Sequence, residues 1–212
     1  MKNILTVLSL IMIFSCKKED AKTTEKNPSE NQTTINNTSS ITTNDSIKTI
    51  DDIKKEYANI NRMLTSKKLD STQFSYNCNE REGEVTLYYK DNKLAAVKDF
   101  YAEYSHFSSS TTYFVKNDQV FFIFNDETVW SFDGGTPEKP ETNDDIKEKR
   151  IYILDNKAVQ CFEKNYSIQS KGNNKNPENI SNHETDCTAI EFIKRYELIL
   201  KNKNMKDKIQ CL

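Results

Sequence analysis

The chain has 212 residues, of which 35% are hydrophobic and 29% charged, and its formal net charge is −2. This balance of charge excludes the strong basic field with which proteins gather nucleic acid, so we expect no nucleic-acid partner. Ten tyrosines, eleven phenylalanines and one tryptophan predict a packed core, in a chain long enough for one domain plus appendages.

The first 15 residues are predicted to form an export signal. A short positive start, Met1 to Asn3, is followed by an apolar run from Ile4 to Phe14. This run is too short for a membrane-spanning helix, which needs about 20 residues. Its length and position are typical of the apolar region of a secretory signal peptide.

The residues Ile13-Phe14-Ser15-Cys16 resemble the lipobox of bacterial lipoproteins. In that family the cysteine becomes the first mature residue and carries a diacylglycerol thioether and an N-acyl chain such as palmitate. The resemblance implies that Cys16 attaches the protein to a membrane, because several acyl chains together anchor a protein stably.

The three residues Lys18, Glu19 and Asp20 sharpen this expectation about location. They resemble the Lys-acidic-acidic signal with which some Gram-negative lipoproteins are exported to the cell surface. The resemblance implies a protein lipid-anchored in the outer membrane and exposed at the cell surface. The periplasmic face of that membrane is the alternative.

Residues 16–45 are predicted to combine the lipidated cysteine with a disordered tether. Of the 29 residues from Lys17 to Asp45, 15 are Thr, Asn or Ser. Such a stretch cannot bury enough apolar surface to offset the entropy lost on ordering. We therefore expect a single folded domain at residues 46–212.

Two amphipathic helices are predicted at the ends of this domain. Apolar residues recur every three or four positions in the first helix, at Ile47, Ile50, Ile53, Tyr57, Ile60 and Leu64. Ser46 or Thr49 is suited to cap it. The second helix is expected from Thr188 to Lys203, where Thr188 and Glu191 have the spacing of a capping box.

Short β-type runs lie between the two helices, and three of them look alike. They are Tyr88 to Leu94 (YYKDNKL), Phe114 to Val120 (FVKNDQV) and Tyr152 to Ala158 (YILDNKA). Each reads as a strand, an Asn/Asp pair suited to a two-residue hairpin turn, and a second strand. The wider spacing before the third run is assigned to a polar insertion at residues 134–147.

These patterns predict an α+β fold, in which an antiparallel β-meander of repeated hairpins is flanked by an N-terminal and a C-terminal amphipathic helix. We expect both helices to cover one face of the sheet. The stretch from Val85 to Phe162 resembles uncharacterised secreted bacterial proteins built from aromatic-strand, Asn-Gly-Lys, aliphatic-strand repeats. That resemblance implies a fold and no particular activity.

Four cysteines follow Cys16, and an even number in an exported protein predicts disulfides. Four cysteines allow three pairings. We favour Cys161 with Cys187, which would close a polar loop before the second helix, and Cys78 with Cys211. The alternative is that some of them are buried free thiols.

Motifs that carry catalysis are missing from the sequence. There is no Gly-rich phosphate loop, no G-x-S-x-G elbow and no H-E-x-x-H motif. His183 lies four residues before Cys187, but no second cluster completes a zinc site. The pair Asp144-Asp145 falls in the polar insertion. We therefore predict no catalytic residue, no metal and no cofactor.

The stretch from Phe100 to Phe107 carries aromatic side chains on both alternating faces of a predicted strand. Phe100, Tyr101, Tyr104, His106 and Phe107 form a candidate binding surface for a protein or glycan ligand. The alternative is a strand covered on both sides. The leading hypothesis is therefore a non-enzymatic lipoprotein with a binding or structural role.

Two other functions stay open. Phe74 to Cys78 resembles the start of membrane-bound lysozyme inhibitors, which implies a periplasmic inhibitor of a host enzyme. The inhibitory Ser-Gly-x-x-Tyr loop of that family would correspond to Ser109 to Tyr113, which lacks the glycine. A hydrolase acting on cell-surface polymers is the second alternative.

Overall fold

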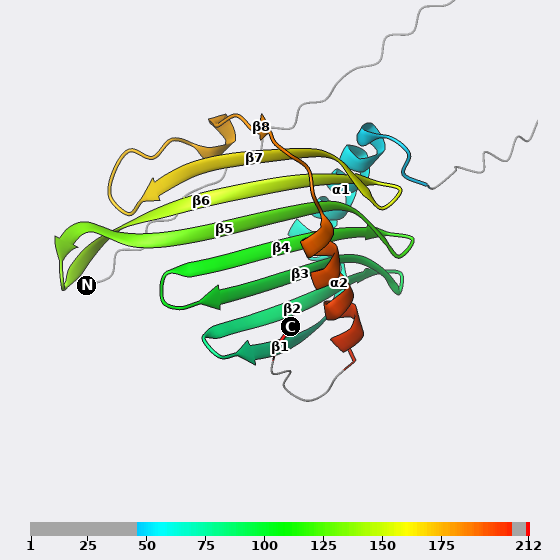
Figure 1. Ribbon diagram of the computed structural model, residues 1–212, viewed down its shortest axis with the longest axis horizontal. Helices are drawn as coiled ribbons and strands as arrows, with labels where there is room; N and C mark the ends of the chain where they lie inside the picture. The colour runs from blue at the N-terminus through cyan, green and yellow to red at the C-terminus, as the bar shows by residue number, and fades with distance from the viewer. Residues whose placement is uncertain (1–45, 205–210) are drawn as a thin grey trace, which may run out of the picture. The chain divides into compact units, whose positions relative to one another are not determined.

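The computed structural model describes residues 46–204 and 211–212. In this part of the chain, eight antiparallel strands form one sheet in which the spatial order is the chain order, with a helix near each end (Figure 1). The expected α+β meander is thereby confirmed. The elements are α1 (Ile50–Thr65), β1 (Asp70–Cys78), β2 (Arg81–Lys90), β3 (Lys93–Glu103), β4 (Phe107–Lys116), β5 (Gln119–Thr136), β6 (Lys139–Leu154), β7 (Lys157–Gln169), the short 3-10 helix η1 (Pro177–Asn179), β8 (His183–Glu184) and α2 (Ile190–Asn202).

The three look-alike runs are hairpins, as predicted. Their turn residues have positive φ at both positions, as in Asp91 (50°) and Asn92 (64°), which is the conformation that tight two-residue hairpins require. Each hairpin also has a register shift two or three residues from its turn, for example between Phe114 and Val115. The repeated unit is therefore a turn together with a bulge.

The prediction that both helices cover one face is wrong, because they lie on opposite faces (Figure 1). Ile53 and Ile60 of α1 pack with Ala96 and Phe122 in one buried cluster. Tyr196 and Ile199 of α2 belong to a second cluster, formed with the other side of the strands. The continuous apolar runs of the strands account for this, since alternate side chains need cover on both faces.

The helix starts differ in how they are capped. Thr49 is the N-cap of α1 and forms a capping box with Asp52, so Thr49 rather than Ser46 fills that role. The capping box predicted for Thr188 and Glu191 is wrong. The N-cap of α2 is Ala189, which makes no side-chain capping bond.

The polar insertion predicted at residues 134–147 is not a loop. These residues extend β5 and β6 into the longest hairpin of the sheet, which projects at one end (Figure 1). Asp144 and Asp145 accordingly lie in a strand, where they face opposite sides of the sheet. We refer to residues 130–144 as the hairpin arm.

Both favoured disulfide pairings are present. Cys78 at the end of β1 is bonded to Cys211, and Cys161 of β7 is bonded to Cys187. The second bond holds the segment that follows β8 against the sheet just before α2 begins. The described cysteines are therefore all in disulfides, and none is a free thiol.

Candidate functional site: the aromatic end of the sheet

The two ends of the sheet differ in what surrounds them. The turns at 91–92, 117–118 and 155–156 lie at the end crossed by both helices (Figure 1). The β3–β4 turn and the hairpin arm lie at the other end, beyond the helices. The residues predicted as a binding surface belong to this second end.

The expectation that Phe100 to Phe107 form one strand is wrong. Phe100 and Tyr101 belong to β3, Tyr104 and His106 lie in the turn, and Phe107 begins β4. Tyr104 has a φ of 56°, and its N–H donates to the carbonyl oxygen of Glu80 over 3.3 Å. The reversal at the turn, rather than a strand covered on both sides, therefore accounts for the dense aromatic pattern.

Tyr101 and Phe107 lie on the face that carries α2. Their ring centroids are 5.9 Å apart, and the guanidinium of Arg81 lies 4.4 Å from the centroid of Tyr101. Arg81 also pairs with the carboxylate of Glu103 over 2.9 Å. These two rings are half-buried and contribute to packing.

His106 contacts two aromatic residues of β5 that sequence reasoning missed. Its ring centroid is 4.1 Å from that of Trp130 and 6.3 Å from that of Phe132. The Trp130 N–H donates to the carbonyl oxygen of His106 over 3.0 Å, and Nδ1 of His106 lies 3.0 Å from the carbonyl oxygen of Trp130. The β3–β4 turn is thereby fixed to the base of the hairpin arm.

Large rings at this end remain in contact with water. Tyr104 is 70% exposed, Phe132 66% and Phe100 43%. With His106 and Trp130 they form a set that we call the aromatic end, defined by Phe100, Tyr104, His106, Trp130 and Phe132. The sequence does contain a signal for Trp130 and Phe132. They alternate with Val129 and Ser131, which predicts that both rings lie on the same face of one strand.

Carboxylates lie directly opposite two of these rings. Trp130 pairs across the strands with Asp144, and Phe100 pairs with Glu84. Residues opposite each other in antiparallel strands have Cβ atoms about 4.5–5.5 Å apart and point to the same face. Each ring therefore has an acidic neighbour on the face that carries α1, outside the area that α1 covers.

A network of charged residues lies on the same face, toward β7. Glu148 is 6% exposed and accepts bonds from Arg150 (2.6 Å), Tyr166 (2.8 Å) and Lys164 (3.2 Å). Lys164 also donates to the carbonyl oxygen of Pro177 over 3.1 Å. The network thereby ties the segment before β8 to the sheet.

Asp126 and Glu148 face each other across β5 and β6, and their pKa values shift in opposite directions. Burial, and then the nearby Glu148, raise the pKa of Asp126. Burial opposes the charge of Glu148 too, but hydrogen bonds from Arg150, Tyr166 and Lys164 outweigh it and lower the pKa. Carboxylates with divergent pKa values can divide acid and base roles, as the hydrolase hypothesis requires. Here three donors already occupy Glu148, as in a structural ion-pair network.

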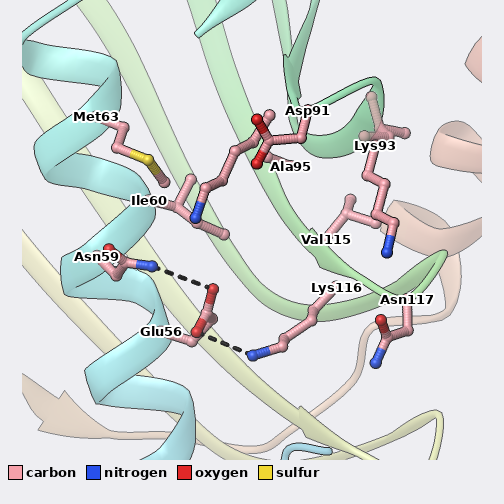
Figure 2. Close-up of a pocket in the computed structure, with 12 residues that line it drawn as sticks. Glu56, Asn59, Ile60, Met63, Asp91, Lys93, Ala95, Val115, Lys116 and Asn117 are labelled. Atoms are coloured by element: carbon pink, nitrogen blue, oxygen red, sulfur yellow. Dashed lines mark hydrogen bonds and ion pairs between the residues drawn. The ribbon is translucent and has the colours of Figure 1, made fainter. Parts of the chain in front are cut away.

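A pocket of about 380 Å³ lies at the opposite end, between α1 and the first two repeated turns (Figure 2). Ile60 and Met63 of α1 and Ala95 and Val115 of the strands contribute its apolar surface. Glu56 accepts a bond from Lys116 over 3.1 Å at the rim. This volume suits a small ligand, but the pocket contains none of the predicted site residues.

The segment compared with the inhibitory loop of lysozyme inhibitors lies within β4. Ser109 and Thr111 are buried and bonded to Asn125, and Tyr113 is fully buried. Ser109 to Tyr113 therefore do not form an exposed loop. Burial, followed by the charge of Asp99, raises the pKa of the Tyr113 phenol.

The predicted lipid attachment and export residues, Cys16, Lys18, Glu19 and Asp20, lie outside the described residues. Within the described ranges, no group of three or more His, Cys, Asp or Glu side chains is arranged to hold a metal ion. Over the same ranges, no helix has the length and apolar character needed to cross a membrane.

Comparisons with known proteins leave the site to be interpreted on its own geometry. No protein-family model, curated protein or solved structure matches the chain.

Proposed function

We propose that this protein is a membrane-anchored, non-enzymatic binding protein whose ligand surface is the aromatic end of the sheet. The observation that carries the proposal is the exposure of Tyr104 and Phe132, at 70% and 66%, at the end of the sheet where Phe132 contacts the rings of His106 and Trp130. Exposed groups of large apolar side chains mark interaction surfaces, and aromatic rings dominate the energetics of such surfaces.

The anchor in this proposal is a lipid on Cys16, and Lys18, Glu19 and Asp20 direct the protein to the cell surface. Support comes from the sequence of the leader. Residues 46–48 line a pocket with Asn117 and Asp155, at the helix end of the sheet. From Gln119 to Phe132, β5 spans about 40 Å at roughly 3.3 Å per residue. The first described residues of the domain therefore lie far from the aromatic end.

The rest of the domain acts as a scaffold in this proposal. The two helices are amphipathic covers, an interpretation supported by buried Ile53 and Ile60 in α1 and buried Tyr196 and Ile199 in α2. The helices cover both faces at one end of the sheet and leave the other end open. Strand pairing between β4, β5 and β6 holds the backbone of the aromatic end in place, and a preorganised surface loses less conformational entropy when it binds.

The anchor is tested by metabolic labelling with an alkyne fatty acid. Label on the wild-type chain, and its loss in Cys16→Ser, are expected. Protease added to intact cells should remove the domain, and replacement of Lys18, Glu19 and Asp20 by Ala should protect it. A domain that is cleaved only after lysis would place the protein on the periplasmic face.

The binding surface is tested with the double variant Tyr104→Ser and Phe132→Ser. Both side chains are exposed, so the midpoint of thermal unfolding should stay unchanged while capture of ligands is lost. The matched control is Val159→Ser, which removes another exposed apolar side chain, 47% exposed, from β7. Lysozyme, a glycan array and a peptide array supply the ligands. A fall in stability without a change in capture would assign the rings to packing.

A further inference from the structure

Four basic side chains in the described part of the chain are held in the same way. Each lies over an aromatic ring and at the same time pairs with a carboxylate. The four cases are Arg81 with Tyr101 and Glu103, Arg150 with Phe124 and Glu148, Lys164 with Tyr166 and Glu148, and Arg195 with Tyr76 and Asp99. The distances from cation to ring centroid run from 4.4 to 5.4 Å, which is within the range of cation–π attraction.

The aromatic end repeats the ring and the carboxylate but lacks the cation. Trp130 lies opposite Asp144 and Phe100 lies opposite Glu84. Neither carboxylate has an ion-pair or hydrogen-bond partner among the described residues. Lys98, two residues before Phe100 on the same face, forms no ion pair there either. Two ring–carboxylate pairs are thus left without the basic side chain that completes the other four.

The surrounding charge favours a cationic ligand. The hairpin arm carries four carboxylates, at Asp133, Glu138, Glu141 and Asp144, and one basic residue, Lys139. Glu141 already pairs with Lys171. An acidic surface attracts a basic partner over a range of about 8–10 Å at physiological salt and raises the rate of encounter.

We infer that the aromatic end binds a basic protein or peptide, whose arginine or lysine side chains lie between Trp130 and Asp144 and between Phe100 and Glu84. This inference rests on the proposed function and names the chemistry of its ligand. Arginine fits best, because its planar guanidinium stacks on a ring while its N–H groups bond a carboxylate.

The test uses Trp130 as its own reporter, since it is the one tryptophan of the chain. The full-length protein in detergent is titrated with an Arg-Ser repeat peptide while tryptophan emission is recorded. A saturable change in emission is expected, with affinity that falls about tenfold from low to high salt. A Glu-Ser peptide of equal length should cause no change.

Two variants and one control separate this chemistry from simple stacking. Asp144→Asn and Glu84→Gln should each weaken binding of the Arg-Ser peptide about fivefold, which corresponds to roughly 1 kcal/mol. Asp133→Asn is the matched control on the arm, because its carboxylate already accepts a bond from Gln169 over 2.9 Å. It should weaken binding less than either of the other two variants, because only its long-range attraction for the ligand is lost.

The possible failures can be told apart. If Asp144→Asn and Glu84→Gln leave the affinity for the Arg-Ser peptide unchanged, the inference is wrong. The inference is also wrong if a neutral chitin oligosaccharide changes Trp130 emission and the Arg-Ser peptide does not. In that case the aromatic end would still be a binding surface. No response to peptide, oligosaccharide or lysozyme would count against both the inference and the proposed function.

Discussion

Arg195 of α2 donates from Nε to Oδ2 of Asp99 on β3 over 2.8 Å, across 96 residues of sequence. Its Nη2 also lies 2.6 Å from the hydroxyl of Tyr76, which itself donates to Asp99 over 3.0 Å. Asp99 is only 3% exposed. A charge buried this deeply is compensated by the helix that packs over it.

Replacing Arg195 by Met should therefore destabilise the domain by about 3–5 kcal/mol, because it leaves the Asp99 carboxylate buried without its cation. Urea unfolding measures the loss. Adding Asp99→Leu to Arg195→Met should restore part of the stability, since replacing both partners removes the unpaired charge. Equal loss in the single and double variants would assign the effect to packing of the helix alone.

Gly83 is required by the ring of Tyr76. A Cβ at position 83 would lie 2.1 Å from Cζ of that ring. Gly83→Ala should cost about 1–3 kcal/mol, as overpacking of a core does. In a Tyr76→Leu background the same substitution should cost less, and a double-mutant cycle measured by chemical denaturation gives the coupling. A coupling near zero would show that the strand backbone adjusts instead.

The two disulfides should differ in their contribution to stability. Cys78–Cys211 closes a loop of 133 residues and Cys161–Cys187 a loop of 26. Loop-closure entropy gives upper estimates of roughly 5 and 3.5 kcal/mol. Replacing each pair by Ser should therefore lower the midpoint of denaturation more for the first pair. The opposite order would mean that the segment before α2 depends on its disulfide for more than closure entropy.

Acid should affect Asp126 and Glu148 in opposite ways. Because the pKa of Asp126 is raised in the folded protein, its protonation favours folding. This contribution to stability is fully present below the ordinary pKa of 3.8 and is lost as the pH rises through the folded-state pKa. Asp126→Asn should therefore stabilise the protein at neutral pH, with a gain that disappears in acid. Thermal unfolding across pH 3 to 8 measures this change, and a gain independent of pH would contradict it.

Glu148 has a lowered pKa in the folded protein, so its ionised carboxylate contributes to stability. This contribution is fully present above the ordinary pKa of 4.5 and is lost as the pH falls through the folded-state pKa. Glu148→Gln should cost about 3–5 kcal/mol at neutral pH, since it leaves buried Lys164 without its charged partner. The cost should shrink in acid, where the wild-type carboxylate is also protonated. Glu82→Gln, an exposed change on β2, is the control and should have no effect.

The order of strands and the turns could be predicted from local patterns, because each hairpin is fixed by an Asn/Asp pair and its flanking apolar residues. The neighbours at the aromatic end could not. The turn at 117–118 alone sets Lys116 opposite Gln119 and would place His106 opposite Val129. The bulge beside Phe114 shifts the register by one residue, so that Trp130 instead of Val129 lies opposite His106. The shift also changes which face of the sheet each side chain in this part of β5 points to.

The sequence pattern also did not predict that the two helices cover opposite faces of the sheet. Periodicity identifies which residues are apolar, but it does not say which helix covers them. The start of α2 shows a related limit, since Thr188 and Glu191 have the right spacing and tertiary packing places the helix start at Ile190. The disulfide pairing was easier to predict, because four cysteines allow only three pairings.

The strictly sequential order of the sheet has a consequence for how the chain folds. All seven strand pairings join neighbours in sequence, and hairpins of this kind form in microseconds. A chain that emerges from its N-terminal side can therefore build most of the sheet as it appears. The surface around Tyr76 and Asp99 stays uncovered until residues 190–202 arrive, and Cys78 waits still longer for Cys211. Cys78 is thus the thiol most open to mispairing during folding, and oxidation at this position should be the last step of maturation.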